Sequence, residues 1–559
     1  MVTSQATAAA TLDRRTALSP RLVALVAPIA VGAIVIANGW SGLMPGVGFW
    51  DTGEFQTVLP LLGTAHPTGY PTYVLLGFLA SLLLAPIGEP AFRINLLSLL
   101  AVAVAAGATV ALVRRLSGST IIGIAVGLGL ATTPFVWKYA MAADPHPIHL
   151  AFVALLLLAL VKWEQARRDA SDGGADDATS GQMGGPASPE TRQADRWLVV
   201  AAVLFGLAAG NHSLTLLLVP PIALYVLAVE PGIWRRWRFA LTCIGAATLA
   251  LALVFLELPL RGGLVPSLTA PLVYAKPATW NGFWDIALAE QFRGSLSDPF
   301  ANLGGKWDEL MRVVAIPQFG LLLIALPPAF LATARRAPRY ALLTGLAFVI
   351  TLLFNAAYSN ADINRYYLGP ILWVWTWLGV LAADVAYVAG IAGASIVGRA
   401  RRIGLENEPI DIAAGGAAIV LGAVLLWPAV STLGARRVAV DRSGDTQARS
   451  WLAQVLPRLP ENAVLVSWWS TSTPLWYAQK VEAQRPDLFI VDDRTMLDLD
   501  LGRAPDVIRR YLGENRPVYV IRLPGRDTDE LTAQFDMTVV AGEGSDAVWQ
   551  VRGPLVAAK

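Results

Sequence analysis

Two carboxylates stand three residues apart, shortly after the first apolar run of the chain. Asp51 and Glu54 lie in the sequence WDTGEF, and His66 and Tyr70 follow in HPTGYP. If residues 51–63 form a helix, both carboxylates project from one face. A carboxylate near a bilayer surface can act as a base, a hydrogen-bond acceptor or a cation ligand. A simpler interpretation stays open, in which Asp51 only caps the helix.

The next polar residue of interest is Arg93, which precedes a long apolar run in the sequence AFRIN. Charged side chains are costly beside hydrocarbon, so each one suggests a function. An arginine at this place either extends to the lipid headgroups or holds a phosphate. Both interpretations remain open.

A third group follows the apolar run 119–137. It contains Asp144, His146 and His149, together with Pro145 and Pro147. Asp144-Pro145 is also typical of a simple turn. Two histidines beside an aspartate suggest metal ligands, but the prolines disturb the regular helical spacing. No metal site is predicted here.

Two more polar groups lie where other apolar runs end. His212 stands between the runs 197–210 and 213–229, and Arg365 lies in the sequence SNADINRYY. A histidine satisfied by neighbouring backbone is the plainer explanation of His212. All of these groups stand at the ends of runs, whereas a transporter is expected to place them near the middle of the bilayer. The pattern favours an interfacial active site.

The apolar runs must position these residues. A transmembrane helix needs about 20 predominantly apolar residues. Eleven runs qualify or nearly qualify: 21–39, 94–113, 119–137, 147–163, 197–210, 213–229, 239–260, 313–333, 340–358, 367–389 and 412–433. A twelfth run, 72–87, is short and flanked by prolines, so we expect an interfacial or re-entrant helix there.

Basic clusters determine the expected topology, because cytoplasmic loops carry the excess of Lys and Arg. Arginine groups near positions 114, 167, 235, 335 and 400 all fall on one side if the run 72–87 does not cross the membrane. Asp51 and Asp144 then lie together on the other side. We therefore expect a cytoplasmic N-terminus and an extracytoplasmic C-terminal domain in a plasma membrane of bacterial type.

Composition supports a membrane protein and excludes other classes. Of 559 residues, 55% are hydrophobic and only 15% are charged, whereas a soluble protein has about a quarter charged residues. The net charge of +2, without a basic aromatic patch, gives no indication of nucleic-acid binding. The single cysteine, Cys243, excludes an internal disulfide and a thiolate metal site.

The remaining segments complete the predicted organisation. The C-terminal part contains five short strand patterns separated by helical ones and no Gly-rich phosphate loop, so we expect a small α/β domain without nucleotide binding. The predicted parts are a cytoplasmic tail (1–20), a transmembrane domain (21–433) with outer loops 40–91 and 261–312, a disordered cytoplasmic loop (169–196) and the extracytoplasmic α/β domain (434–559).

The residues already named resemble a known family. The WDTGEF and HPTGYP sequences, Arg93-x-Asn95 and the sequence GLAAGNH, which ends at His212, look like the DUF2723 family of multi-spanning membrane proteins. That family is similar to protein O-mannosyltransferases of the glycosyltransferase-C (GT-C) superfamily. The resemblance covers the N-terminal half well and becomes looser after it. It implies a GT-C-like fold with about 11 transmembrane helices and a C-terminal α/β domain.

The resemblance also implies chemistry. Enzymes of this superfamily transfer a sugar from a polyprenyl-phosphate carrier with inversion, using a carboxylate of the first outer loop. This role falls on Asp51, with Glu54 as the second acid of the motif. A set of residues is expected to bind the donor phosphate or the substrate: Arg93, His66, Tyr70, Asp144, His146, His212 and Arg365. Asp144 matches less closely, because many relatives are expected to carry a glutamate.

The predicted function is thus an inverting glycosyltransferase that moves a hexose, with mannose favoured, to Ser or Thr of secreted proteins. The expected partners are the lipid-linked donor, the acceptor protein or envelope glycan, and membrane lipid. No cofactor is expected, because the leaving group is a lipid phosphate. The alternatives are a transferase for envelope lipid or polysaccharide, and a transporter or flippase without transfer chemistry. Tyr70, Trp280 and Trp284 are candidates to stack on sugar rings.

Overall fold

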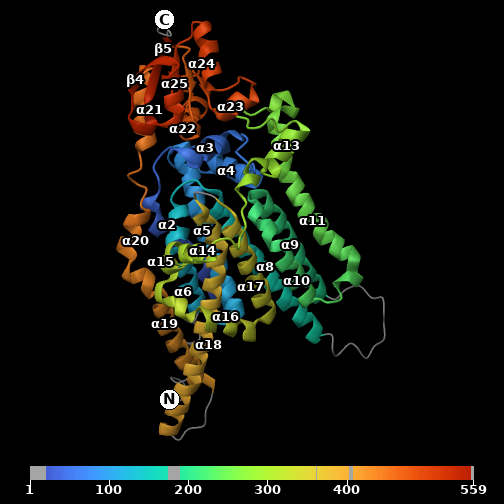
Figure 1. Cartoon of the computed structure of the whole chain (residues 1–559). Coiled ribbons are helices and arrows are strands. Elements are labelled where there is room, and N and C mark those ends of the chain that lie inside the picture. The colour runs from blue at the N-terminus through green and yellow to red at the C-terminus, as the bar shows by residue number, and fades with distance from the viewer. Residues whose placement is uncertain (1–19, 174–188, 360–361, 402–406, 556–559) are drawn as a thin grey trace.

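A computed structural model describes residues 20–173, 189–359, 362–401 and 407–555. A bundle of long helices forms one part, and a small α/β part stands at one end of it (Figure 1). Two short helices, α3 (Trp50–Leu61) and α4 (Pro71–Leu83), lie between the two parts. The polar residues of the first outer loop are therefore held at the junction.

Nine helical stretches among the described residues are long and apolar enough to cross a membrane. A tenth arises if the bent pair α6 and α7, which turns by 64°, is one span, and Ser213–Val229 is a shorter apolar helix. The eleven predicted runs all fall on these stretches. The helices that form them are α2 (Pro20–Gly39), α5 (Pro90–Ser117), α6 (Thr120–Ala131), α7 (Pro134–Ala140), α8 (Pro145–Gly173), α9 (Pro189–Asn211), α10 (Val219–Val229), α11 (Trp237–Phe255), α14 (Leu303–Glu309), α15 (Ile316–Phe319), α16 (Leu326–Arg336), α17 (Pro338–Ala357), α18 (Leu368–Arg401) and α19 (Asn407–Ser431).

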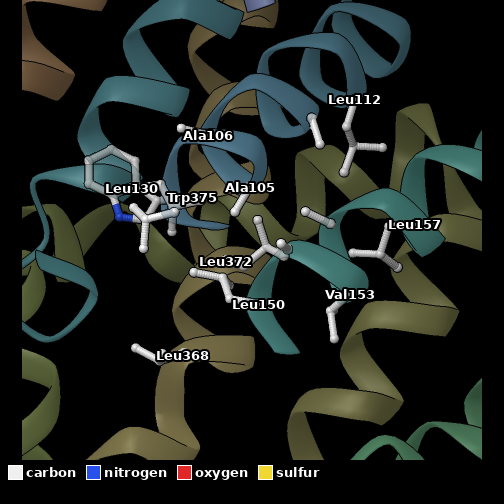
Figure 2. Packing of buried hydrophobic residues seen from close by; sticks show 14 of the residues in the cluster. Ala105, Ala106, Leu112, Leu130, Leu150, Val153, Leu157, Leu368, Leu372 and Trp375 are labelled. Carbon is white, nitrogen blue, oxygen red and sulfur yellow. The ribbon is translucent and has the colours of Figure 1, made fainter. Parts of the chain in front are cut away.

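The core of the bundle packs around α5, α6, α8 and α18. Leucine, valine and alanine side chains of these helices belong to one buried cluster, which also contains Trp375 of α18 (Figure 2). Small residues let the backbones approach: a Cβ on Gly123 or on Gly127 of α6 would lie 2.8 Å from a carbonyl oxygen of α5. Such close contacts are how helices associate in a bilayer, where burial of apolar surface gives little driving force.

Helix α4 is too short to span a membrane. Its 13 residues make a rod of about 20 Å, against the roughly 30 Å of a hydrocarbon core. It coincides with most of the predicted run 72–87. On the same end of the molecule, the chain between α11 and α14 forms short helices, among them α12 (Glu257–Pro259) and the amphipathic α13 (Trp280–Ala287).

At the opposite end of the bundle, arginine side chains join the ends of neighbouring helices. Arg336, at the end of α16, donates hydrogen bonds to the carbonyl oxygens of Leu116 and Ser117 at the end of α5. Arg236, before α11, pairs with Asp195 of α9. The basic groups that the sequence places on one side of the membrane therefore gather at one end, away from α3 and the α/β part.

Helices α8 and α9 take in residues 169–173 and 189–196, the two ends of the segment expected to be a disordered loop. Residues 174–188 between them lie outside the described residues, as does nearly all of the predicted tail 1–20.

The α/β part contains a five-stranded sheet in the order β2-β1-β3-β5-β4. Strands β1 (Val464–Val466), β2 (Phe489–Val491) and β3 (Val518–Val520) are parallel, while β4 (Phe535–Ala541) and β5 (Val548–Pro554) form an antiparallel pair at one edge. All five lie within the predicted strand patterns or overlap them. The helices of this part are α21 (Gln447–Val455), α22 (Trp469–Trp476), α23 (Asp493–Asp498), α24 (Ala504–Gly513) and α25 (Arg526–Thr532). Helix α20 (Leu433–Val440), which was predicted to belong to the α/β domain, lies beside the bundle and packs on α7 and α19 (Figure 1).

Candidate functional site

Asp51 lies on the first turn of α3, where it accepts two hydrogen bonds. The indole Nε1 of Trp469 donates to Oδ1 at 3.1 Å, and a guanidinium nitrogen of Arg365 donates to Oδ2 at 3.4 Å. Trp469 belongs to α22 of the α/β domain, and Arg365 precedes α18. Three parts of the chain therefore meet at this carboxylate.

Arg365 also joins Asp51 to Asp144. Its second terminal nitrogen lies 3.5 Å from an Asp144 carboxylate oxygen, and the other Asp144 oxygen accepts a hydrogen bond from the backbone N–H of His146 at 2.8 Å. A planar guanidinium with several donors can hold two carboxylates at once, which a lysine ammonium does less well. The two carboxylates predicted to share one face of the membrane are brought together.

Glu54 and His66 form a buried pair directly behind Asp51. The backbone N–H of His66 donates to one Glu54 oxygen at 2.7 Å, and the ring Nδ1 contacts the other oxygen. On the far side of the ring, Nε2 lies 3.2 Å from the Tyr70 hydroxyl. Tyr70 and Trp50 have left-handed φ values of 49° and 59°, a backbone strain that tends to occur at functional sites.

A pair of buried amides fixes the loops that carry the two aspartates. Gln56 accepts a hydrogen bond from the Gly48 N–H at 2.8 Å and donates to Asn95 at 2.8 Å. The same Asn95 oxygen accepts from the Ala143 N–H at 2.9 Å. Because Ala143 precedes Asp144, helix α5 sets the position of one aspartate relative to the other.

Three histidines continue the site away from Asp51. The ring of His212 lies 4.6 Å from that of His146 and 5.9 Å from that of His149, and Tyr366 stacks on His146. The side chain of His212 accepts a hydrogen bond from the Leu214 N–H, so part of the plain interpretation of this histidine is also correct.

These groups surround a cavity of about 860 Å³. Beyond the residues already described, it is lined by three further cations and by a set of aromatic and apolar side chains. The cations are Lys138, Arg293 and Arg442. The aromatic and apolar members include Phe49, Tyr139, Tyr274, Leu288, Phe292, Leu296, Phe354 and Tyr358. The volume and the mixture of cations and rings suit a sugar attached to a phosphate.

The protonation states follow from these contacts. Burial alone would raise the pKa of Asp51, but the neighbouring His66, Arg365 and Trp469 together hold it below its ordinary value. Burial raises the pKa of Glu54 and of Asp144, although His66 and Arg365 respectively oppose this effect. Burial would lower the pKa of His66, but Glu54 and Asp51 raise it above its ordinary value. Asp51 is thus the carboxylate best held in the ionised form.

The predicted site residues are distributed as follows. Six of them line the cavity: Asp51, His66, Tyr70, Asp144, His212 and Arg365. Glu54 and His146 lie behind them, each in contact with a lining side chain. Arg93 lies elsewhere, because its guanidinium donates to the carbonyl oxygen of Ser81 in the last turn of α4 and to those of Ile87 and Gly88 beyond it.

Trp280 and Trp284 also lie outside the cavity lining, and Trp280 is 76% exposed. In contrast, sequence reasoning missed Trp469, Tyr274 and Arg442. The predicted strand pattern AVLVSWW ends at Trp469, whereas β1 ends at Val466 and Trp469 begins α22. The sequence also gave no sign of its partner in α3.

Asp51, Glu54 and His66 could hold a metal ion, since one ligand atom from each lies within 4.8 Å of the others. In the structure these atoms already have partners. Glu54 and His66 contact each other, and the two Asp51 oxygens accept from Trp469 and Arg365. The donor set fits a cation by type but is satisfied by protein groups.

Comparisons with known proteins agree with this architecture. Residues 51–232 match the family model described as the protein O-mannosyl-transferase TMEM260 N-terminal domain. A curated relative, protein O-mannosyl-transferase TMEM260 of Mus musculus, is 26% identical over 475 residues, which are 80% of this chain and 59% of the relative. The chain therefore spans about three fifths of that relative's length.

Among solved structures, ArnT from Cupriavidus metallidurans has a similar fold. The form bound to undecaprenyl phosphate and the apo form both give a TM-score of 0.53 and cover 94% of this chain and 97% of theirs, at 16% and 15% sequence identity. The chain is therefore a polytopic GT-C-fold protein with a soluble C-terminal α/β domain, and it is similar over its N-terminal part to protein O-mannosyl-transferase TMEM260.

Proposed function

We propose that this chain is an inverting glycosyltransferase that moves a hexose from a polyprenyl-phosphate carrier to an acceptor hydroxyl. The observation that carries the proposal is the bridging of Asp51 and Asp144 by Arg365 at the wall of one large cavity. The cavity lies at the junction of the membrane helices and the α/β domain, where a lipid-linked sugar and a water-soluble acceptor can meet.

Asp51 is the proposed general base. A hydroxyl is a poor nucleophile and must lose its proton as the bond to the anomeric carbon forms. The neighbouring His66 and Arg365 favour the ionised form of Asp51, so the base is unprotonated when the acceptor arrives. Glu54 acts through His66, which it holds against the carboxylate.

The leaving group is the phosphate of the lipid carrier. Negative charge grows on that phosphate as the sugar departs, and cations at the cavity wall stabilise it. Arg365 is the central candidate, with Lys138, Arg293 and Arg442 at other points of the lining. We do not assign Arg93 to the donor phosphate, because its guanidinium donates to backbone carbonyl oxygens. The proposed chemistry needs no metal cofactor, because Arg365 supplies the positive charge.

Mannose and Ser or Thr of secreted proteins are the proposed sugar and acceptor. The similarity to TMEM260, a protein O-mannosyl-transferase, supports this choice, and the undecaprenyl phosphate bound in the ArnT structure supports the proposed donor carrier. Transfer to an envelope glycan is the second candidate. The acceptor side is proposed to face away from the cytoplasm, in a bacterial-type plasma membrane with the N-terminus inside.

The test is transfer of labelled hexose from a polyprenyl-phosphate donor by purified protein. Asp51→Asn should still bind the donor but lose at least about two orders of magnitude in turnover, the usual loss for a general base. Asp308→Asn, in an exposed ion pair with Arg312, is the matched control and should keep full turnover. Full activity in Asp51→Asn would refute the proposal.

The acceptor is tested in cells. Intact masses of secreted proteins should differ by one or more hexoses between cells with and without this chain. If only envelope glycans change, the second candidate is correct. Acceptor-independent lipid flux that is insensitive to Asp51→Asn would instead identify a transporter.

A further inference from the structure

The α/β domain delivers one side chain directly to the proposed base. Trp469 Nε1 lies 3.1 Å from Asp51 Oδ1, although the two residues are 418 positions apart in sequence. The α/β domain makes other polar contacts with the helix bundle, such as the ion pair of Arg449 with Glu89 at 2.7 Å, but this one reaches the carboxylate that is proposed as the base.

Several contacts fix the helix that carries Trp469 against α3. A Cβ on Gly53 would lie 2.8 Å from the Thr473 hydroxyl of α22, so the glycine permits the two helices to touch. The rings of Trp50 and Trp468 meet edge to face at 4.8 Å. Just after α22, the Tyr477 hydroxyl accepts a hydrogen bond from the Ala91 N–H of α5 at 3.1 Å.

The indole itself has little freedom. The Trp469 ring packs edge to face against the rings of His66, Tyr274 and Trp476, with distances between ring centroids of 5.9, 6.0 and 5.8 Å. Its N–H therefore points at Asp51 without the loss of conformational entropy that a flexible donor would suffer. Arg365 holds the opposite carboxylate oxygen, so the plane of the carboxylate is fixed from two sides.

We infer that Trp469 is a positioning residue for Asp51, so that the active site is complete only when α22 of the C-terminal domain is docked on α3. Each oxygen of the Asp51 carboxylate has about two lone pairs, and Trp469 and Arg365 use one on each oxygen. The remaining lone pairs are free to receive the proton of the sugar-accepting hydroxyl. By fixing the carboxylate plane, Trp469 determines which of these lone pairs faces the cavity. The kinetic test of this inference rests on the proposed function, whereas the spectroscopic test needs only the contact between Trp469 and Asp51.

The test compares neighbouring tryptophans. Trp469→Phe keeps an aromatic ring but removes the N–H donor. Trp468→Phe also keeps a ring to meet Trp50, but the indole N–H that it removes has no partner among the described residues. In Trp469→Phe we expect kcat to fall about ten-fold, the value of one hydrogen bond to a charged group. The donor KM should stay unchanged, and the acid limb of the pH profile should move to higher pH. Trp468→Phe should keep the wild-type kcat and profile.

A purely structural role would lower the amount of folded protein and leave the pH profile of the remainder unchanged. Wild-type kcat and pH dependence in Trp469→Phe would overturn the inference, and so would an equal loss in Trp468→Phe.

A second measurement does not depend on activity. The protein is labelled with 5-fluorotryptophan, and the ¹⁹F resonance that disappears in Trp469→Phe is assigned to Trp469. This resonance should shift in Asp51→Asn and stay in place in Asp308→Asn. If the wild type transfers no sugar but the shift occurs, the proposed function fails and the contact stands. If the resonance does not respond to Asp51→Asn, the positioning role is refuted.

Discussion

At the residue scale, the proposed chemistry depends on the charge of Asp51, which a few neighbouring side chains control. His66 and Arg365 are the two charged groups that lower the pKa of Asp51, and the pKa of His66 is itself raised because Glu54 and Asp51 lie beside it. His66 therefore keeps its proton to a higher pH than an ordinary histidine does. While it is protonated, it favours the ionised form of Asp51 and so lowers the pKa of that carboxylate.

This coupling gives a pH prediction for His66→Gln. The glutamine retains a polar group beside Glu54 but carries no charge, so the pKa of Asp51 should rise toward its ordinary value. Because turnover needs the ionised base, the acid limb of the rate profile should move to higher pH. The measurement is kcat against pH with the lipid-linked donor.

The control is His149→Gln. His149 is buried like His66, but its hydrogen-bond partner among the described residues is the Thr215 hydroxyl and not a carboxylate. Its replacement should leave the acid limb in place even if turnover changes. An unshifted limb in His66→Gln would show that His66 does not act on the base.

The sequence predicted part of this site and missed the rest for physical reasons. Asp51, Asp144 and Arg365 were identified as polar groups at the ends of apolar runs, and the crossing count placed them together. Trp469 could not be identified in this way, since its role depends on how a soluble domain docks. Arg93 was assigned to a phosphate because the sequence does not show that unpaired carbonyl groups at the end of α4 lie within its reach.

At the scale of elements, the approach of α3 to its neighbours is controlled by Gly53. A Cβ at this position would lie 2.2 Å from the Gly48 carbonyl oxygen and 2.8 Å from the Thr473 hydroxyl. Both distances are too short for real contacts, and the carbonyl belongs to backbone that Gln56 and Asn95 hold in place. An added methyl group must therefore push α3 away from the loop before it and from α22.

We expect Gly53→Ala to lower turnover strongly and to reduce stability by about 1–3 kcal/mol, the usual cost of overpacking. The readouts are turnover and the thermal unfolding midpoint in detergent. The control is Gly434→Ala, since a Cβ on Gly434 of α20 meets no atom within 4 Å. There the alanine should be neutral or stabilise the helix by up to about 1 kcal/mol. Equal behaviour of the two variants would show that the tight packing of α3 is unimportant.

The helices were predicted more completely than the site, because their signal is local. The run 119–137 is the instructive exception, since the chain bends by 64° between α6 and α7 within it. Pro134 begins α7, and a proline restricts the residue before it to extended conformations, so the break has a local cause. Because residues on both sides of the break are apolar, the hydropathy of the run gave no sign of the bend.

At the scale of the whole molecule, the two ends of the bundle differ in charge and in role. The end that carries α3, α13 and the α/β domain holds the cavity, whereas the other end holds the arginine contacts of Arg236 and Arg336. Positively charged loops remain on the cytoplasmic side of a membrane. The cavity end is therefore expected to face outward.

Two glycines with open space around them allow this orientation to be tested. A Cβ on Gly232, next to the arginines before α11, or on Gly294, beside Arg293 at the cavity end, would meet no atom within 4 Å. The native Cys243 is first replaced by alanine, which leaves a chain without thiols. Gly294→Cys should then react with a membrane-impermeant maleimide in intact cells. Gly232→Cys should react only after the cells are opened, because its loop lies on the cytoplasmic side. Labelling of Gly232→Cys alone in intact cells would reverse the orientation and place the cavity on the cytoplasmic face, where a secreted protein cannot be its acceptor.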